Sequence, residues 1–136
     1  MKPFQIRFLD HVAIRVRDLE VSAQWYEKVI GLKRYTFPEW GPFPLFMLSG
    51  KTGVALFPVK TDQPKSLGKE DFIKIDHFAF NVDASSFEAA QQYFQSMGLA
   101  FELQDHVFFH SLYLKDPDGH TVELTTLVGK EEDFYQ

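Results

Sequence analysis

Two histidines stand at equivalent positions in two related stretches of the chain. His11 lies in the sequence LDHVAIRV and His77 lies in IDHFAFNV, with an offset of 66 residues between them. A carboxylate, Glu123, interrupts the strand-like sequence TVELT near the end of the second stretch. Two imidazoles and one carboxylate form a ligand set that holds Fe²⁺ and similar divalent ions while leaving other coordination positions open. We therefore predict a metal site made of His11, His77 and Glu123.

The residue types also indicate which metals suit such a site. The chain contains no cysteine, which excludes thiolate ligands, disulfides and a thiol nucleophile. A closed structural zinc site is therefore not expected. Carboxylate and imidazole ligands favour Fe²⁺ or Mn²⁺, with Zn²⁺ and Ni²⁺ as alternatives.

The sequence YLKDPDGHTVEL predicts how Glu123 is placed. Its centre, DPDG, supplies a side-chain acceptor, a proline with fixed φ and a glycine that tolerates positive φ, as a type I turn with a bulge requires. Such a loop pairs Asp116 with His120, and therefore Tyr113 with Glu123. Because side chains alternate along a strand, Tyr113 and Glu123 are expected on the same face of the sheet.

The same alternation divides the two histidine strands into two faces. Val12, Ile14 and Val16 share one face, which suits packing under a helix, and Phe78, Phe80 and Val82 repeat this pattern. His11, with Ala13 beside it, takes the other face, as does His77 in the second copy. One face of the sheet is therefore predicted to carry both histidines, Tyr113 and Glu123, with small neighbours that leave room for a ligand.

The elements that position these residues are written twice in the chain. Each copy is predicted as strand, helix and three strands, which makes an α+β fold of two tandem βαβββ modules. The expected strands of module one, about residues 6–58, are 6–16, 32–37, 44–49 and 54–58, with a helix that starts after Asp18, carries Val21, Trp25 and Val29 four apart, and ends at Gly31. In module two, about residues 72–127, the expected strands are 73–82, 100–105, 108–115 and 120–127, with a helix from about residue 84 to Gly98 that places Phe87, Ala90, Phe94 and Met97 on one stripe. Residues 59–71 are interpreted as a connector and residues 128–136 as a loose charged tail.

Length, composition and charge exclude several classes of function. With 136 residues the chain is expected to be a single domain, and its 45% hydrophobic content argues against disorder. A net charge of −5 without a basic stripe argues against nucleic-acid binding. No apolar run reaches membrane-spanning length and no signal sequence is recognisable, so we expect no membrane partner and a cytoplasmic location. The 15 phenylalanines indicate an aromatic-lined cavity.

The sequence resembles a known superfamily over residues 6–127. The paired strands LDHVAIRV and IDHFAFNV, the Gly-Leu after each helix and the closing YLKDPDGHTVEL are similar to the vicinal oxygen chelate superfamily. This group includes glyoxalase I, extradiol dioxygenases, methylmalonyl-CoA epimerase, fosfomycin-inactivating transferases and bleomycin-resistance proteins. The resemblance implies that the two modules form an open, barrel-like curved sheet with the helices outside. It also implies a metal held by His11, His77 and Glu123, which substrate oxygens chelate.

The resemblance also allows a comparison of ligand number. Glyoxalase I carries a fourth ligand, Glu or Gln, at the end of its first module. An offset of 66 from Glu123 points to Phe57, whose nearest neighbour on the same face is Ala55, and neither residue binds metal. The site is therefore expected to have three protein ligands, as in the extradiol dioxygenases and the fosfomycin enzymes.

The dioxygenase pattern continues through the second module. Those enzymes carry a histidine, a Leu-Tyr pair, Asp-Pro-x-Gly and the ligand Glu, which match in order and spacing His106, Leu112-Tyr113, Asp116-Pro117-Asp118-Gly119 and Glu123. The sequence departs from that pattern at two points. Gln104 stands where the pattern prefers a small or β-branched residue or Asn, and residues 60–76 contain no histidine that could serve as the acid and base. Tyr113 and His106 are thus the predicted catalytic residues. The alternatives are cross-strand packing for Tyr113 and a surface loop position for His106.

These residues predict a metal-dependent enzyme acting on a small molecule with vicinal oxygens, with O₂-dependent ring cleavage slightly favoured. A glyoxalase-like lyase or isomerase and a fosfomycin-type thiol transferase are alternatives, and a metal-independent binding protein like the bleomycin-resistance members is an alternative of another class. A homodimer is expected, because two modules leave sheet edges unpaired. The residues expected to contact substrate are Arg15, Asn81, Phe57, Met47 and Phe109.

Overall fold

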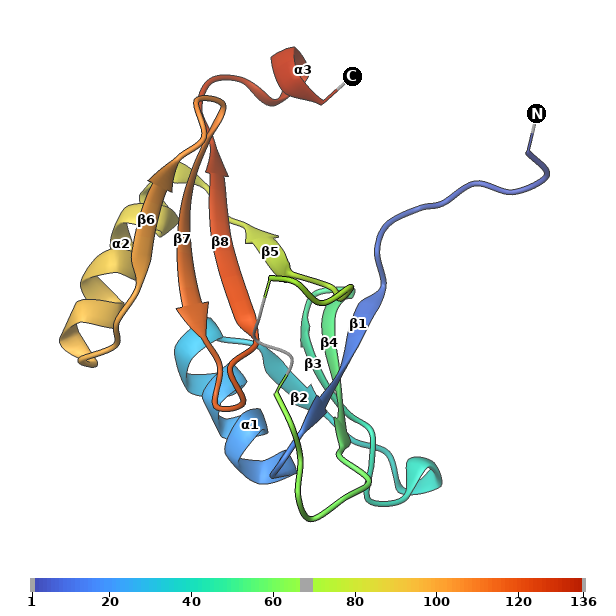
Figure 1. Cartoon of the computed structure of the whole chain (residues 1–136). Helices are drawn as coiled ribbons and strands as arrows, with labels where there is room; N and C mark the ends of the chain where they lie inside the picture. Colours follow the sequence, from blue (N-terminus) through green and yellow to red (C-terminus); the bar gives the residue numbers. More distant parts are fainter. Residues whose placement is uncertain (1, 67–69, 136) are drawn as a thin grey trace. The chain divides into compact units, whose positions relative to one another are not determined.

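The computed structural model describes residues 2–66 and 70–135. The chain divides into two compact units, Met1–Ser66 and Leu67–Gln136, and each unit contains one four-stranded mixed sheet (Figure 1). The predicted α+β class and the two βαβββ modules are confirmed. Residues 67–69 of the predicted connector and residue 136 of the predicted tail lie outside the described residues. In the described ranges, no helix is both long enough and apolar enough to cross a bilayer.

The first unit has the strand order β1-β4-β3-β2. Strands β1 and β4 are parallel, and the other two pairs are antiparallel. Its elements are β1 His11–Val16, α1 Leu19–Trp25, a π-helical turn Tyr26–Ile30, β2 Lys33–Tyr35, a short 3₁₀ helix Pro38–Trp40, β3 Leu45–Ser49 and β4 Thr52–Pro58.

The second unit repeats this arrangement with the strand order β5-β8-β7-β6. Again the first pair, β5 and β8, is parallel and the other pairs are antiparallel. Its elements are β5 His77–Asn81, α2 Ala84–Ser96, β6 Glu102–Asp105, β7 Phe109–Lys115, β8 Thr121–Leu127 and a short helix α3 Glu131–Phe134.

Both long helices begin and end where the capping residues indicate. The side chain of Asp18 accepts a hydrogen bond from the backbone N–H of Val21 at 3.0 Å, and Asp83 does the same for Ser86 at 2.8 Å. These carboxylates satisfy N–H groups that have no partner inside the helix. The helical segment of the first unit stops at Gly31, whose φ of 84° is in the left-handed region that glycine tolerates.

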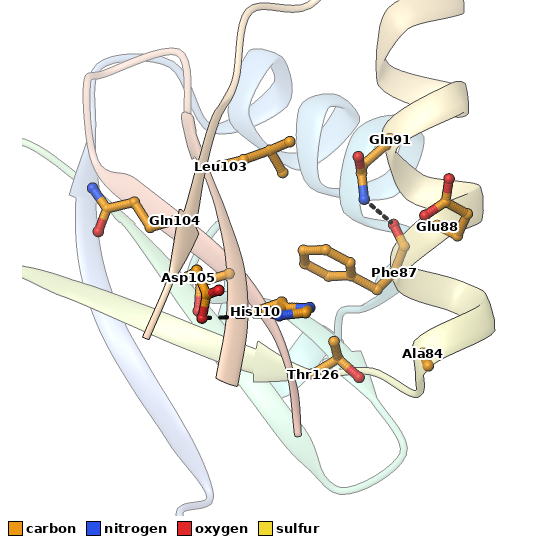
Figure 2. A pocket seen from close by; sticks show the side chains of 10 residues that line it. Ala84, Phe87, Glu88, Gln91, Leu103, Gln104, Asp105, His110 and Thr126 are labelled. Atoms are coloured by element: carbon orange, nitrogen blue, oxygen red, sulfur yellow. Dashed lines mark hydrogen bonds and ion pairs between the residues drawn. The ribbon is translucent and has the colours of Figure 1, made fainter. Parts of the chain in front are cut away.

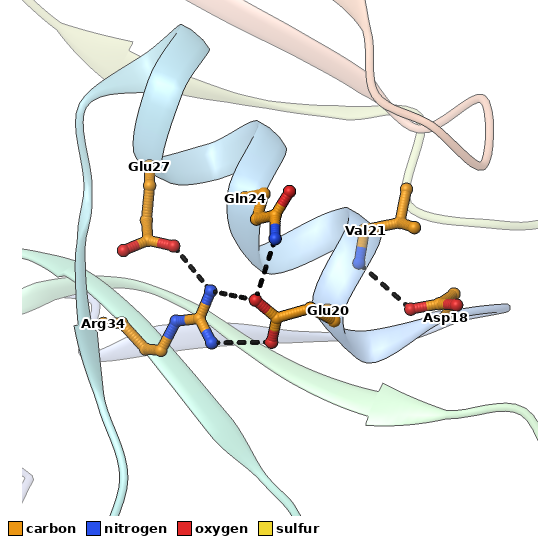
Figure 3. Close-up of polar contacts among 6 residues, drawn as sticks. All are labelled: Asp18, Glu20, Val21, Gln24, Glu27 and Arg34. Carbon is orange, nitrogen blue, oxygen red and sulfur yellow. Dashed lines mark hydrogen bonds and ion pairs between the residues drawn. The ribbon is translucent and has the colours of Figure 1, made fainter.

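An arginine joins β2 to the helical segment of the first unit (Figure 3). The guanidinium of Arg34 donates to both carboxylate oxygens of Glu20, at 2.8 and 3.0 Å, and to Glu27 at 2.6 Å. A planar guanidinium suits this geometry because its fork of N–H groups can bind a carboxylate with two parallel bonds. The network lowers the pKa of the Glu20 carboxyl, and it fixes the helix over the sheet that carries His11.

The structure differs from several local expectations. The strand predicted at 6–16 begins only at His11, and the strand predicted at 73–82 begins only at His77, because each parallel ladder starts at the histidine. In the helical segment 19–30, Val29 of the predicted stripe is buried, but Val21 is 52% exposed, and Ala23 and Tyr26 are buried in its place. The tail is not loose over its described part, since Phe134 of α3 packs against Phe109 with ring centroids 4.7 Å apart.

Candidate metal centre

The closing hairpin places Glu123 as the turn residues predict. Tyr113 pairs with Glu123 across β7 and β8. The backbone N–H of Asp116 donates to the carbonyl of His120 at 2.9 Å, and Gly119 has φ of 87°. The Asp116 carboxylate accepts hydrogen bonds from the backbone N–H groups of Asp118 and His120, both at 2.9 Å. Local turn chemistry therefore fixes the register that puts a carboxylate opposite Tyr113.

His77 lies between two carboxylates at the start of β5. Its Nδ1 is 2.7 Å from Oδ2 of Asp76, and its Nε2 is 3.1 Å from Oε1 of Glu123. Glu123 is 7% exposed, whereas Asp76 lies at the surface. The hydrogen bond to His77 is the main cause that lowers the pKa of the Asp76 carboxyl, so this group is ionised at neutral pH.

The donor set around His77 suits a bound cation. Ionised carboxylates only accept hydrogen bonds, so the contact with Asp76 requires a proton on Nδ1 of the imidazole. A neutral His77 then presents a lone pair at Nε2, and Glu123 presents another one 3.1 Å away. Two such acceptors repel each other unless a cation, either a proton or a metal ion, neutralises them. The pair therefore fits a divalent metal that takes imidazole and carboxylate ligands.

A buried serine holds the other oxygen of Glu123. Ser111, which is 1% exposed, donates from Oγ to Oε2 of Glu123 at 3.0 Å. The same Oγ is 3.0 Å from Oγ1 of Thr125. A hydrogen bond to a charged acceptor contributes roughly 1.5–3 kcal/mol. Ser111 thus fixes the carboxylate with Oε1 facing His77.

Tyr113 and His106 form a second pair beside this centre. The Tyr113 hydroxyl is 2.9 Å from Nε2 of His106, and its ring meets the His77 ring edge-on at a centroid distance of 5.7 Å. Burial is the main cause that raises the pKa of the Tyr113 hydroxyl, and Glu123 raises it further. Tyr113 therefore keeps its proton at neutral pH and can act as a hydrogen-bond donor.

The turn that carries His106 is strained. Among the residues that the structure describes, Val107 is the one non-glycine residue with a positive φ, and its φ is 70°. The Asp105 side chain accepts from the Val107 N–H at 2.8 Å, and the backbone N–H of His106 donates to the carbonyl of Phe109 at 2.8 Å. These bonds hold a β-branched residue in a region that it rarely occupies, and they set the position of His106 next to Tyr113.

His11 has a related environment in the first unit. Its Nδ1 is 2.7 Å from Oδ1 of Asp10, the same distance as in the Asp76–His77 pair. Its ring lies 4.9 Å from the ring of Phe46. The Asp-His repeat in the sequence is thus matched by a repeated side-chain geometry. The carboxylates Asp10 and Asp76, like Ser111, were not assigned a role from sequence, although the repeated Asp-His pair was a usable signal.

The predicted ligands divide between the two units. His77 and Glu123 are brought together in the second unit, and His11 belongs to the first. Over residues 2–66 and 70–135, no group of three or more His, Cys, Asp or Glu side chains that could hold a metal ion is found. The assignment of His11 to the same ion therefore remains a prediction from the sequence repeat.

The register corrects the predicted counterpart of Glu123 in the first unit. Glu123 pairs with Ala79, two residues after His77. Two residues after His11 is Ala13, and its partner on β4 is Ala55, not Phe57. On this strand the offset is 123 − 55 = 68 and not 66, because the segments between the matched strands differ in length in the two units. Since alanine has no ligand atom, the first unit still supplies no fourth ligand.

The residues expected to contact substrate have varied surroundings. Arg15 lies over the ring of Phe57, 5.3 Å from its centroid, and donates to the carbonyl of Pro58 at 2.9 Å. Asn81 is exposed on β5, on the same face as His77. Met47, by contrast, is fully buried and pairs with the buried Val54, so it packs on the opposite face from His11. Phe109 is half-buried and is packed against Phe134.

A cavity of about 530 Å³ lies between α2 and the outer strands of the second sheet (Figure 2). Phe87 of α2 and Leu103 of β6 form apolar parts of its lining, and Nε2 of His110 is 3.9 Å from Oδ1 of Asp105. Side chains alternate in face along β7, so His110 points to the opposite face from Ser111 and Tyr113. His110 therefore lies on the helix side, and the cavity lies mainly on the face away from Glu123.

Comparisons with known proteins identify a family and several relatives of the chain. Residues 8–124 match the family model described as Glyoxalase/Bleomycin resistance protein/Dioxygenase superfamily. The chain is 27% identical to Glutathione transferase FosA of Serratia marcescens over 119 residues, covering 88% of this chain and 80% of the relative. It is 26% identical to Metallothiol transferase FosB of Staphylococcus epidermidis (96% and 89% covered) and 26% identical to Glyoxylase I 4 of Arabidopsis thaliana (90% and 72% covered).

The fold is also found among solved structures. A glyoxalase/dioxygenase from Nostoc punctiforme superposes with a TM-score of 0.76 at 22% identity, covering 95% of this chain and 97% of that one. This likeness concerns the fold, and the family match covers most of the sequence. The chain belongs to the Glyoxalase/Bleomycin resistance protein/Dioxygenase superfamily.

Proposed function

We propose that the chain is a divalent-metal-dependent enzyme that transfers a thiol to a small electrophilic molecule. The observation that carries the proposal is the pair of His77 and Glu123, whose lone-pair atoms face each other at 3.1 Å. The repeated Asp-His sequence supports His11 as the third ligand. Mn²⁺ or Fe²⁺ is the metal that this thiol-free ligand set favours.

Thiol transfer is preferred over the other reactions of the superfamily. FosA and FosB are named as transferases of glutathione and of a metallothiol type, and the matches span most of each protein. Ala55 leaves the first unit without the fourth ligand expected of glyoxalase I. The ring-cleaving dioxygenase reaction that Tyr113 and His106 slightly favour is not supported by these relatives, and thiol transfer takes its place.

The chemistry assigned to the residues is the following. When bound, the metal acts as a Lewis acid that polarises a substrate oxygen. The thiolate sulfur forms a C–S bond as the adjacent C–O bond of an epoxide-like substrate breaks, and the oxygen released as an alkoxide takes up a proton. The Tyr113 hydroxyl gives its proton to that oxygen, and His106, whose Nε2 is 2.9 Å from the hydroxyl, returns a proton to Tyr113. The proton that the thiol loses on forming the thiolate balances the one that the product gains. Arg15 and Asn81 contact polar groups of the substrate.

The test is a thiol-transfer assay with the purified chain. Metal-free protein is loaded with Mn²⁺, Fe²⁺, Zn²⁺ or Ni²⁺ and incubated with fosfomycin or another small epoxide and with glutathione or cysteine. Loss of thiol and the mass of the adduct are measured. Adduct formation with at least one metal is expected, and His77→Ala and Glu123→Gln should abolish it. His110→Ala is the matched control, because this histidine lies on the other face of the same sheet.

Two results would contradict the proposal. Isomerisation of the hemithioacetal of glutathione and methylglyoxal, without any epoxide adduct, would assign the chain to the glyoxalase-like lyases and isomerases. Tight binding of a small molecule that is unaffected by metal removal or by Glu123→Gln would indicate a metal-independent binding protein.

A further inference from the structure

The imidazole of His77 lies between two carboxylates, and a neutral imidazole has a single N–H group to donate. Oδ2 of Asp76 is 2.7 Å from Nδ1, and Oε1 of Glu123 is 3.1 Å from Nε2. Both carboxylates act only as acceptors when ionised, so they compete for the same proton. The shorter contact shows which of them the geometry favours.

We propose that Asp76 is a positioning residue that keeps the metal site open by holding the ring proton of His77 on Nδ1. Nε2 then retains its lone pair, and Oε1 of Glu123 remains without a hydrogen bond from the ring. This inference rests on the proposed function, because it concerns Nε2 and Glu123 as metal ligands. It adds a residue whose part in the site the ligand set alone does not reveal.

Loss of the Asp76 side chain blocks the metal site through a new hydrogen bond and requires no change of the backbone. The proton shifts to Nε2, where the 3.1 Å contact with Glu123 becomes an ordinary hydrogen bond. Ser111 holds Oε2 from the other side at 3.0 Å, so Glu123 stays in place to accept the proton. His77 and Glu123 then satisfy each other, and a metal ion has to break this bond before it can bind. Because the Asp76 side chain is 68% exposed, its loss leaves the core intact.

The first unit provides an internal comparison. Asp10 holds Nδ1 of His11 at 2.7 Å, but the contacts of this imidazole within the described part of its own unit are with Asp10 and the Phe46 ring, not with a carboxylate at Nε2. The proton of His11 therefore has no competing acceptor there. Loss of Asp10 should weaken metal binding less than loss of Asp76.

The first measurement uses metal-free protein with ¹⁵N-labelled histidine at about pH 9, where an ordinary imidazole is neutral. The ¹⁵N spectra report which ring nitrogen carries the proton. His77 of the wild type is expected as the Nδ1–H form, and Asp76→Ala is expected to convert it to the Nε2–H form. Asp76→Asn should keep Nδ1–H, because the amide oxygen still accepts the bond. Asp71→Ala, at an exposed carboxylate before β5, is the control.

The second measurement is the affinity for Mn²⁺ and for Zn²⁺ alone. Loss of a hydrogen-bond partner of a ligating histidine weakens metal binding by about 10–100-fold. We expect this loss of metal affinity for Asp76→Ala. The loss should be smaller for Asp76→Asn, which lacks only the charge, and smaller also for Asp10→Ala. The inference is overturned if Asp76→Ala keeps the Nδ1–H form or binds both metals as tightly as the wild type. A wild-type chain that binds neither metal contradicts the proposed function, whereas the ¹⁵N spectra still decide the role of Asp76.

Discussion

Replacement of Ser111 by alanine tests how Glu123 is held in a buried position. Ser111 is 1% exposed and its Oγ bonds to Oε2 of Glu123 at 3.0 Å and to Oγ1 of Thr125 at 3.0 Å. The first bond has a charged acceptor and contributes roughly 1.5–3 kcal/mol. The second is partly replaced, because Thr125 also donates to the carbonyl of His110 at 3.4 Å. Ser111→Ala should therefore lower the free energy of opening of this sheet by about 2 kcal/mol.

Native-state hydrogen exchange measures this effect within one sheet. Backbone amides of β7 and β8 are expected to lose about 2 kcal/mol of protection in Ser111→Ala, by the bond energy used above. Amides of β3 and β4, in the first unit, serve as the internal control. Thr125→Val removes the neighbouring hydroxyl with little change of shape and should cost less, because its bond is to a neutral group. A loss below about 0.5 kcal/mol in β7 and β8 for Ser111→Ala would refute the claim that this hydroxyl stabilises a buried carboxylate.

Two further predictions concern turns of the second unit. Val107→Gly should stabilise the chain by about 0.5–1 kcal/mol, because relief of left-handed strain of about 1–2 kcal/mol exceeds the entropic cost of glycine. Val107→Ala keeps a Cβ and should therefore gain less stability. A Val107→Gly variant that is less stable than the wild type in urea unfolding would contradict this reasoning. The hydrogen bond with Asp116 raises the pKa of His120, so its stabilisation is complete below the ordinary pKa of about 6.5 and is lost as the pH rises through the raised value. The stability lost in His120→Gln should therefore be larger at about pH 5.5 than at about pH 9, and an equal loss at both pH values would exclude a charged His120 as its cause.

Much of the second unit was predictable from sequence because its signals are local. The residues Asp116 to Gly119 specify a turn with one register, and that register alone puts Tyr113 opposite Glu123. The alternation of apolar residues along β5 and β8 then decides which side chains share a face. The same alternation along β7 assigns His110 to the helix side, where it lines the cavity beside α2.

The first unit shows where the sequence repeat misleads. The offset of 66 is the difference in residue number between His11 and His77. It applies to later strands only if the connecting segments of the two units have equal lengths. The segments between the matched strands differ in length, so the offset is 67 between β3 and β7 and 68 between β4 and β8, and Ala55 and not Phe57 matches Glu123. The helical segment also departs from the predicted stripe, because Val21 and Tyr26 are both large and apolar, and packing against the sheet buries Tyr26.

The position of Glu123 is hard to explain by stability alone. A buried charge loses several kcal/mol of hydration, and Glu123 recovers part of it through the hydroxyls of Ser111 and Tyr113 and through the contact with His77. Valine at this position would pair with Tyr113 and complete an apolar strand between Val122 and Leu124. The chain instead keeps a carboxylate there, fixes one oxygen and aims the other at an imidazole whose proton is held on the far nitrogen. Each of these features lowers the cost of placing a cation at that point, and together they favour a metal-binding role for this strand over a structural one.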